Sequence, residues 1–157
     1  MESPQPLSYS PVMPLETRHA IRLRGPWRCQ TSLEEPSQRC TVPGDWGELL
    51  GDDFRGEVIY SRNFGRPTGL EPEDSVELVI EQVDPQASVL LNGQLLGEIP
   101  PGGQAWRRSI SDQLEARNEL QVRLSMLAEQ APARPPGREG TPGGILGEVR
   151  LEIIPAG

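Results

Sequence analysis

The sequence predicts an all-β protein, namely an antiparallel β-sandwich of about eight strands with jelly-roll topology. Its 157 residues include 17 glycines and 17 prolines, a composition that suits short strands joined by turns. Several segments alternate apolar and polar side chains with a period of two, and none keeps an apolar period of 3.6 residues over three turns. The length suits one domain, which can bury roughly two-thirds of its unfolded surface.

The prolines and glycines also divide the chain. Residues 1–15 carry four prolines, so we expect an extended or disordered arm there. Residues 16–157 are expected to form a single β-sandwich domain. Within that domain, residues 126–144 are rich in proline and glycine, which predicts a long irregular loop.

The charge balance disfavours two classes of partner. The chain has 23 acidic residues and 15 basic ones, all of them arginine, for a net charge of −8. A surface for nucleic acid or for an anionic membrane would normally be basic. No apolar run approaches the ~20 residues of a membrane span, and the N-terminus lacks the features of a signal peptide. We therefore expect a cytoplasmic protein with no nucleic-acid or membrane partner.

The first predicted strand covers residues 21–29. Its odd positions are apolar or small and three of its even positions are arginines, which is typical of a half-buried strand. Cys29 and Cys40 then flank a turn near Glu34 and Glu35. In a hairpin symmetrical about that turn the two cysteines lie opposite each other, with Cβ atoms ~4.5–5.5 Å apart, near disulfide range. Because a cytoplasm keeps thiols reduced, we expect close neighbours that stay reduced.

The strongest turn signal is Asn92-Gly93. Both residues tolerate the positive φ that a two-residue type I′ turn requires, and apolar runs flank them. The pattern predicts a tight hairpin with Leu91 opposite Gln94 and Val89 opposite Leu96.

Five segments in order resemble one known family. Residues 42–46 read V-P-G-D-W, and residues 56–64 follow as a strand of the form G-x-x-x-Y-x-R-x-F. Residues 84–97 match D-x-x-A-x-V-x-x-N-G-x-x-x-G, residues 118–122 match N-x-L-x-V, and residues 143–149 are similar to G-G-I-x-R-D-V. Together they resemble the non-catalytic N-terminal sugar-binding domain of family-2 glycoside hydrolases, over about residues 21–154.

This resemblance implies a galactose-binding domain-like jelly roll in which Asp84 holds the turn that enters the Asn92-Gly93 hairpin. It also implies a carbohydrate-binding module without catalytic residues. The paired carboxylates of those hydrolases lie in a separate β/α barrel of roughly 250 residues, for which this chain has no room. The chain departs from the family at Ser109, where aspartate is usual, and at Gly147-Glu148, where arginine and aspartate are usual.

A sugar site requires an aromatic platform together with carboxylate, amide or guanidinium groups for the hydroxyls. The chain has seven aromatic residues, and strand parity assigns Trp27, Tyr60 and Phe64 to the core. Trp106 follows a Gly-Gly loop and is the best platform candidate. In some family members the loop after V-P-G-x-W reaches toward the sugar. The candidate sugar-binding residues are therefore Asp45, Asp52, Asp53, Arg55 and Trp106.

Two alternatives remain open at this stage. Because exposed aromatics are few, the chain could be a protein-interaction or scaffold β-sandwich that has lost sugar binding, with a partner protein in place of a carbohydrate. No cofactor and no metal site are expected, since two cysteines and one histidine cannot supply the four ligands of structural zinc. A structural Ca²⁺ held by loop carboxylates is a minority hypothesis, and an unchanged melting temperature in a calcium titration would exclude it.

Overall fold

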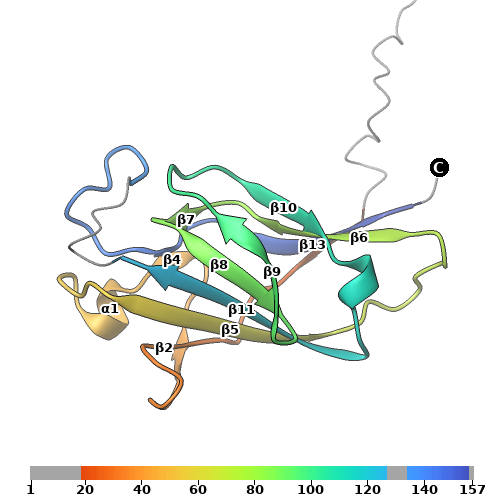
Figure 1. The fold of residues 1–157 in the computed structure, drawn as a ribbon, viewed down its shortest axis with the longest axis horizontal. Coiled ribbons are helices and arrows are strands. Elements are labelled where there is room, and N and C mark those ends of the chain that lie inside the picture. The colour runs from red at the N-terminus through yellow and green to blue at the C-terminus, as the bar shows by residue number, and fades with distance from the viewer. Residues whose placement is uncertain (1–18, 127–133, 156–157) are drawn as a thin grey trace, which may run out of the picture.

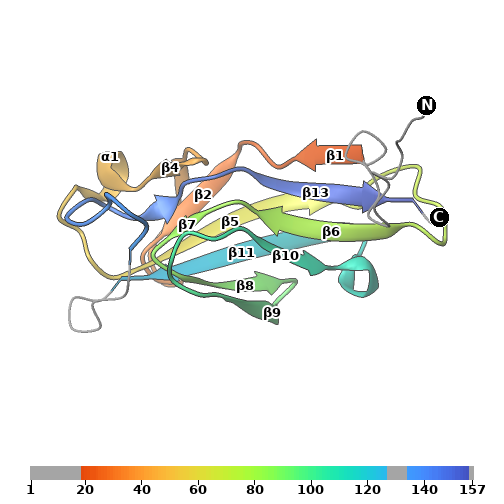
Figure 2. The same cartoon turned by 90° about the horizontal axis from the view of Figure 1, so that it is seen from above.

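The computed structural model describes residues 19–126 and 134–155, so the expected arm 1–15 lies outside the described residues. Two antiparallel sheets pack face to face, as Figures 1 and 2 show. This confirms the predicted β-sandwich. The four-stranded sheet has the order β1 (His19–Arg22), β13 (Val149–Ile154), β6 (Ser75–Ile80), β10 (Trp106–Ser109). The six-stranded sheet has the order β3 (Gln38–Cys40), β2 (Trp27–Gln30), β5 (Glu57–Gly65), β11 (Arg117–Ser125), β8 (Ala87–Leu91), β9 (Gln94–Ile99).

Short elements complete the sandwich. A small third sheet has the order β4 (Gly44–Asp45), β12 (Gly144–Ile145), β7 (Val83–Asp84). Within the described ranges the helical elements are α1 (Gly47–Leu50) and the 3-10 turn η3 (Ser111–Gln113). The described residues thus form more strands than the eight expected, because several predicted runs are interrupted.

The predicted strand 21–29 is one of the interrupted runs. Residues 19–22 pair with β13 in the four-stranded sheet, whereas residues 27–30 pair with β3 and β5 in the other sheet. The single-strand prediction was therefore wrong. The odd positions remain the buried ones where the chain crosses between the sheets, because Leu23 and Trp27 both point into the core. The indole Nε1 of Trp27 donates a 2.7 Å hydrogen bond to the Leu23 carbonyl and so holds the crossing segment against the core.

The last stretch of strand, residues 144–154, is interrupted in the same way. Residues 144–145 pair with β4 and β7, and the chain enters the four-stranded sheet only at Val149. Between them Gly147 packs closely on the residues that follow β6, where a Cβ would lie 2.6 Å from the Cβ of Glu81. A side chain therefore has no room at the position where the resembled family usually has arginine.

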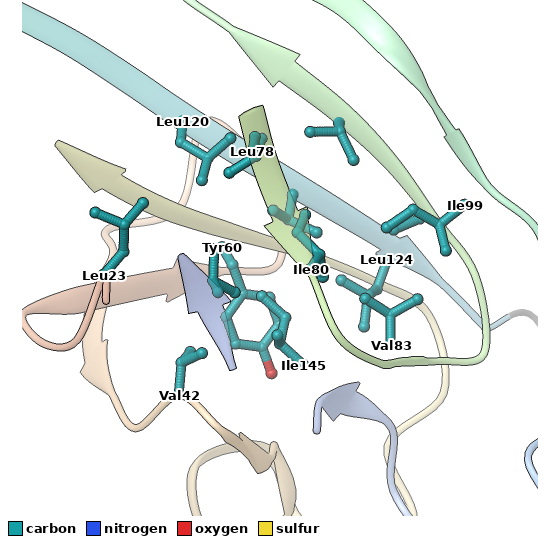
Figure 3. Packing of buried hydrophobic residues seen from close by; sticks show 14 of the residues in the cluster. Leu23, Val42, Tyr60, Leu78, Ile80, Val83, Ile99, Leu120, Leu124 and Ile145 are labelled. Atoms are coloured by element: carbon teal, nitrogen blue, oxygen red, sulfur yellow. The ribbon is translucent and has the colours of Figure 1, made fainter. Parts of the chain in front are cut away.

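The core lies between the two large sheets and contains side chains from both (Figure 3). Trp27 and Tyr60 are buried, as their parity predicted, and burial raises the pKa of the Tyr60 phenol above its ordinary value. Phe64 differs, because it is only half-buried and packs against the edge of the cluster.

The Asn92-Gly93 hairpin is confirmed, with positive φ at both residues and Leu91 opposite Gln94. The predicted pairing of Val89 with Leu96 is wrong. A β-bulge between Val89 and Leu90 places Val89 opposite Gly97 instead. A Cβ on Gly97 would lie only 2.7 Å from Nη2 of Arg108. Because glycine has no side chain, the edge strands β9 and β10 can approach each other at this point.

Cys29 and Cys40 are close neighbours, although the symmetrical hairpin was wrong. Cys40 pairs with Trp27, and Cys29 pairs with Gln38, so the cysteines lie diagonally across β2 and β3. Both are free thiols that share a side-chain hydrogen bond. This bond lowers the pKa of Cys29, because the Cys40 thiol stabilises the Cys29 thiolate, and it raises the pKa of Cys40.

We predict that both cysteines are reduced in the cell. Cells lysed directly into an alkylating reagent should give protein with two modified cysteines by mass spectrometry, because glutathione and thioredoxin keep thiols reduced in a cytoplasm, the location that the sequence predicts. A protein with no modified cysteine would contradict the prediction and indicate a disulfide.

Candidate functional site

The candidate sugar-binding loop lies at one end of the sandwich. It runs from β4 through α1 to the start of β5, and Figures 1 and 2 both place α1 at the same end as the segment before β12. The backbone N–H of Trp46 donates to the Gly143 carbonyl at 2.9 Å, and β4 pairs with β12. Residues nearly one hundred positions apart in the chain therefore build this loop end together.

Trp46 anchors the loop and is not a platform. Its side chain is buried and meets the ring of Phe54 edge to face, with centroids 5.9 Å apart. The indole Nε1 also donates to the Phe54 carbonyl at 3.3 Å. These contacts fix both ends of the segment 47–53. The buried indole of Trp46 thus anchors a polar loop to the core.

Two of the predicted carboxylates converge on Gly47. Its backbone N–H donates to Asp45 Oδ1 at 3.0 Å. A Cβ on Gly47 would lie 2.5 Å from Asp52 Oδ1 and 3.2 Å from Asp45 Oδ1. Glycine at this position therefore lets the two carboxylates of β4 and the loop approach each other, and a larger residue would push Asp52 away.

Arg55 and Asp53 lie beside this pair. The Nη1 of Arg55 donates to the carbonyls of Asp52 at 2.9 Å and of Phe54 at 2.7 Å, which orients the guanidinium along the loop. Asp53 is exposed next to them. The loop thus presents three carboxylates and an oriented guanidinium within nine residues of the V-P-G-x-W motif.

A buried ion cluster around Asp84 supports the loop end. Asp84 is fully buried and binds two guanidiniums. Arg134 Nε donates to Asp84 Oδ1 at 2.6 Å and Nη2 donates to Oδ2 at 2.9 Å, while Arg138 Nε donates to Oδ2 at 2.8 Å. Arg138 Nη2 also lies 3.9 Å from Asp45 Oδ2. The cluster therefore connects the segment 134–142 to β7 and to β4.

The electrostatics of the cluster follow from this geometry. The hydrogen bond to Asp84 raises the pKa of Arg134 above its ordinary value, so this guanidinium is charged at all accessible pH values. The resemblance assigned Asp84 to its own turn, but its side chain binds arginines 50 and 54 positions later in the chain. The sequence offered one signal for this, namely two arginines in the Pro/Gly-rich segment 126–144.

Trp106 occupies a different environment. It begins the edge strand β10 and is half-buried, and the Arg108 guanidinium lies over its ring at 5.5 Å from the centroid. Among the described residues, no hydrogen bond, ion pair or ring contact joins Trp106 to Asp45, Asp52 or Arg55. The loop before β10 packs against the segment 134–142, since a Cβ on Gly103 would lie 3.2 Å from Pro135.

Over residues 19–126 and 134–155, no group of three histidine, cysteine, aspartate or glutamate side chains is arranged to hold a metal ion. Within the same ranges, no helix has the length and apolarity needed to cross a membrane.

Solved structures of similar fold are sugar-processing enzymes, whereas no sequence-family profile and no curated protein sequence matches the chain. A β-D-glucuronidase of Dictyoglomus thermophilum superposes with a TM-score of 0.74 at 20% identity, covering 91% of this chain and 29% of the enzyme. A Bifidobacterium dentium β-glucuronidase complexed with coumarin-3-O-glucuronide gives 0.73 at 22% identity, covering 88% and 30%. A D. thermophilum β-D-mannosidase gives 0.70 at 23% identity, covering 85% and 22%.

The chain has the fold of a family-2 glycoside hydrolase domain. Identity of this order establishes the fold and leaves the function to the residues of the chain itself. The chain spans less than a third of the length of each of these enzymes. The comparisons thus confirm the resemblance at the level of architecture.

Proposed function

We propose that this chain is a non-catalytic carbohydrate-binding domain whose site is the loop end of Asp45, Asp52, Asp53 and Arg55, with Trp106 on β10 as the candidate aromatic platform. One observation carries the proposal. The carboxylates of Asp45 and Asp52 converge over Gly47 beside a guanidinium that backbone carbonyls orient. Carboxylate and guanidinium groups are the partners that sugar hydroxyls need, and a rigid scaffold holds them here.

The interior of the sandwich is an unsuitable alternative for a sugar. Its inward faces carry Val, Leu, Ile and large aromatic side chains packed together. A saccharide buried among them would lose its hydrogen bonds to water without replacement. The exposed loop imposes no such cost, so we place recognition there.

We predict weak and local binding. Chemical-shift mapping with hexoses and hexuronic acids should give saturable shifts in residues 45–55, with a dissociation constant on the order of millimolar to high micromolar, or ~4–6 kcal/mol. The expected weakness reflects the small number of aromatic faces. Asp52→Asn should weaken binding severalfold, because a carboxylate accepts stronger hydrogen bonds than an amide.

Asp112→Asn is the matched control, since Asp112 is an exposed carboxylate in η3, outside the proposed site. It should bind as the parent does. Shifts at Trp106 that titrate together with those of residues 45–55 would support a shared site. An absence of shifts at tens of millimolar sugar would contradict the proposal.

The second candidate function is a β-sandwich that binds a partner protein. The observation that favours it is the low exposure of the tryptophan rings: Trp27 and Trp46 are buried, and Arg108 covers one face of Trp106. Few aromatic faces therefore remain for stacking on a sugar ring. A negative sugar titration would leave this candidate as the survivor.

A further inference from the structure

Three arginines line one cleft at the six-stranded sheet: Arg28 and Arg39 lie on its outer face, whereas Arg62 has the inward parity of Tyr60. Arg28 on β2 lies directly opposite Arg39 on β3, and Arg62 lies nearby on β5. They line a cleft of about 310 Å³ together with polar side chains that include Ser61 and one carboxylate, Glu119. The cleft is therefore locally basic on a chain whose net charge is −8.

The arginines of this cleft are not paired with any carboxylate that the structure describes. Five arginines have a carboxylate oxygen within 4.0 Å: Arg22, Arg107, Arg134, Arg138, Arg150. By the same criterion Arg28, Arg39 and Arg62 have no carboxylate partner among residues 19–126 and 134–155. The same holds for six other described arginines, so the distinguishing feature of Arg28 and Arg39 is that they lie directly opposite each other in one cleft, in which Glu119 is the one carboxylate.

Two of the three guanidiniums are held in place by neutral oxygens. Arg28 donates from Nε to Ser37 Oγ at 2.8 Å and from Nη2 to the Ser37 carbonyl at 3.1 Å, which leaves Nη1 unused. Arg62 donates from Nε to the Arg24 carbonyl at 2.5 Å. The side chain of Arg39 makes no hydrogen bond to any described residue, so its guanidinium is available.

The arrangement has an electrostatic cost. Like charges directly opposite each other on neighbouring strands repel. An oxyanion held between Arg28 and Arg39 would remove this repulsion. Carboxylate, sulfate and phosphate groups match the planar donor fork of arginine in two-point hydrogen bonds.

We propose that the cleft lined by Arg28, Arg39 and Arg62 binds a small ligand that carries a carboxylate, sulfate or phosphate group. The volume suits the anionic group and a few attached atoms. Asn63 and Glu119 also line a neighbouring cleft of about 580 Å³, into which a larger carrier molecule would extend. The site shares no residue with the loop end of Asp45 and Asp52, so it is independent of the proposed function.

The test uses Arg39, because its replacement removes no hydrogen bond within the described chain. Sodium phosphate, sodium sulfate, sodium D-galacturonate and neutral D-galactose are titrated into the labelled protein at constant ionic strength. We expect at least one of the three anions to give saturable shifts in the Nε–H signals of Arg28 and Arg39 and in the Ser61 amide. Arg39→Gln should weaken that binding at least tenfold, since a charge-assisted bidentate contact is lost.

Arg22→Gln removes the same charge from the other sheet and should leave the binding of the anion unchanged. The responding probe identifies the chemistry: phosphate or sulfate indicates an ester or free inorganic anion, and galacturonate without galactose indicates a carboxylated sugar. Shifts that never saturate, equal responses to galactose and galacturonate, or unchanged binding in Arg39→Gln would each overturn the proposal. Shifts in residues 45–55 report the sugar site separately.

Discussion

Asp84→Asn should destabilise the protein by about 3–5 kcal/mol, because removing one partner of a buried ion cluster leaves the other charges uncompensated. Asp84 is fully buried, and the side chain of Arg134 is only 10% exposed. The amide cannot accept both guanidiniums as a carboxylate does. Urea denaturation at neutral pH measures the loss of stability directly.

Asp45→Asn provides the matched control for this prediction. Asp45 lies 3.9 Å from the same Arg138, but its side chain is 38% exposed. An exposed pair contributes at most about 1 kcal/mol, so this variant should remain close to the parent. An Asp84→Asn variant as stable as Asp45→Asn would show that the cluster does not hold the segment 134–142.

Trp27→Ala should destabilise the domain by about 3–5 kcal/mol, a large part of the ~5–15 kcal/mol typical of a domain. The side chain is fully buried between the sheets, and its indole Nε1 binds the Leu23 carbonyl at the crossing between β1 and β2. The substitution removes both the packing and this link. Tyr60→Ala should act similarly, since Tyr60 is 1% exposed in the same cluster.

Two further variants separate the causes of this loss. Trp27→Phe keeps an apolar ring but removes the hydrogen bond, so we expect an intermediate stability. Leu95→Ala removes a side chain that is 57% exposed and should cost little. A melting temperature of Trp27→Ala within a degree or two of the parent would contradict its place in the core.

For the candidate site, the sequence identified the loop but not what supports it. Asp45, Asp52 and Arg55 could be chosen from the V-P-G-D-W motif and its loop, and two of their side chains meet at Gly47. The partners of Asp84 could not be chosen, because Arg134 and Arg138 lie in an irregular segment without periodicity. The basic cleft could not be predicted either, because Arg28, Arg39 and Arg62 come from three strands whose pairing register does not follow from the sequence.

The sequence by itself determined the β-sandwich, the buried Trp27 and Tyr60, and the Asn92-Gly93 turn. Each depends on local rules: period-two alternation, large apolar side chains on one parity, and tolerance of positive φ. Only the tertiary structure decided which sheet each run joins. The chain leaves one sheet after Arg22 and enters the other at Trp27, and the parity is the same on either side because both sheets share one core. Alternation reports which face is buried, whereas backbone pairing with distant strands fixes the partner.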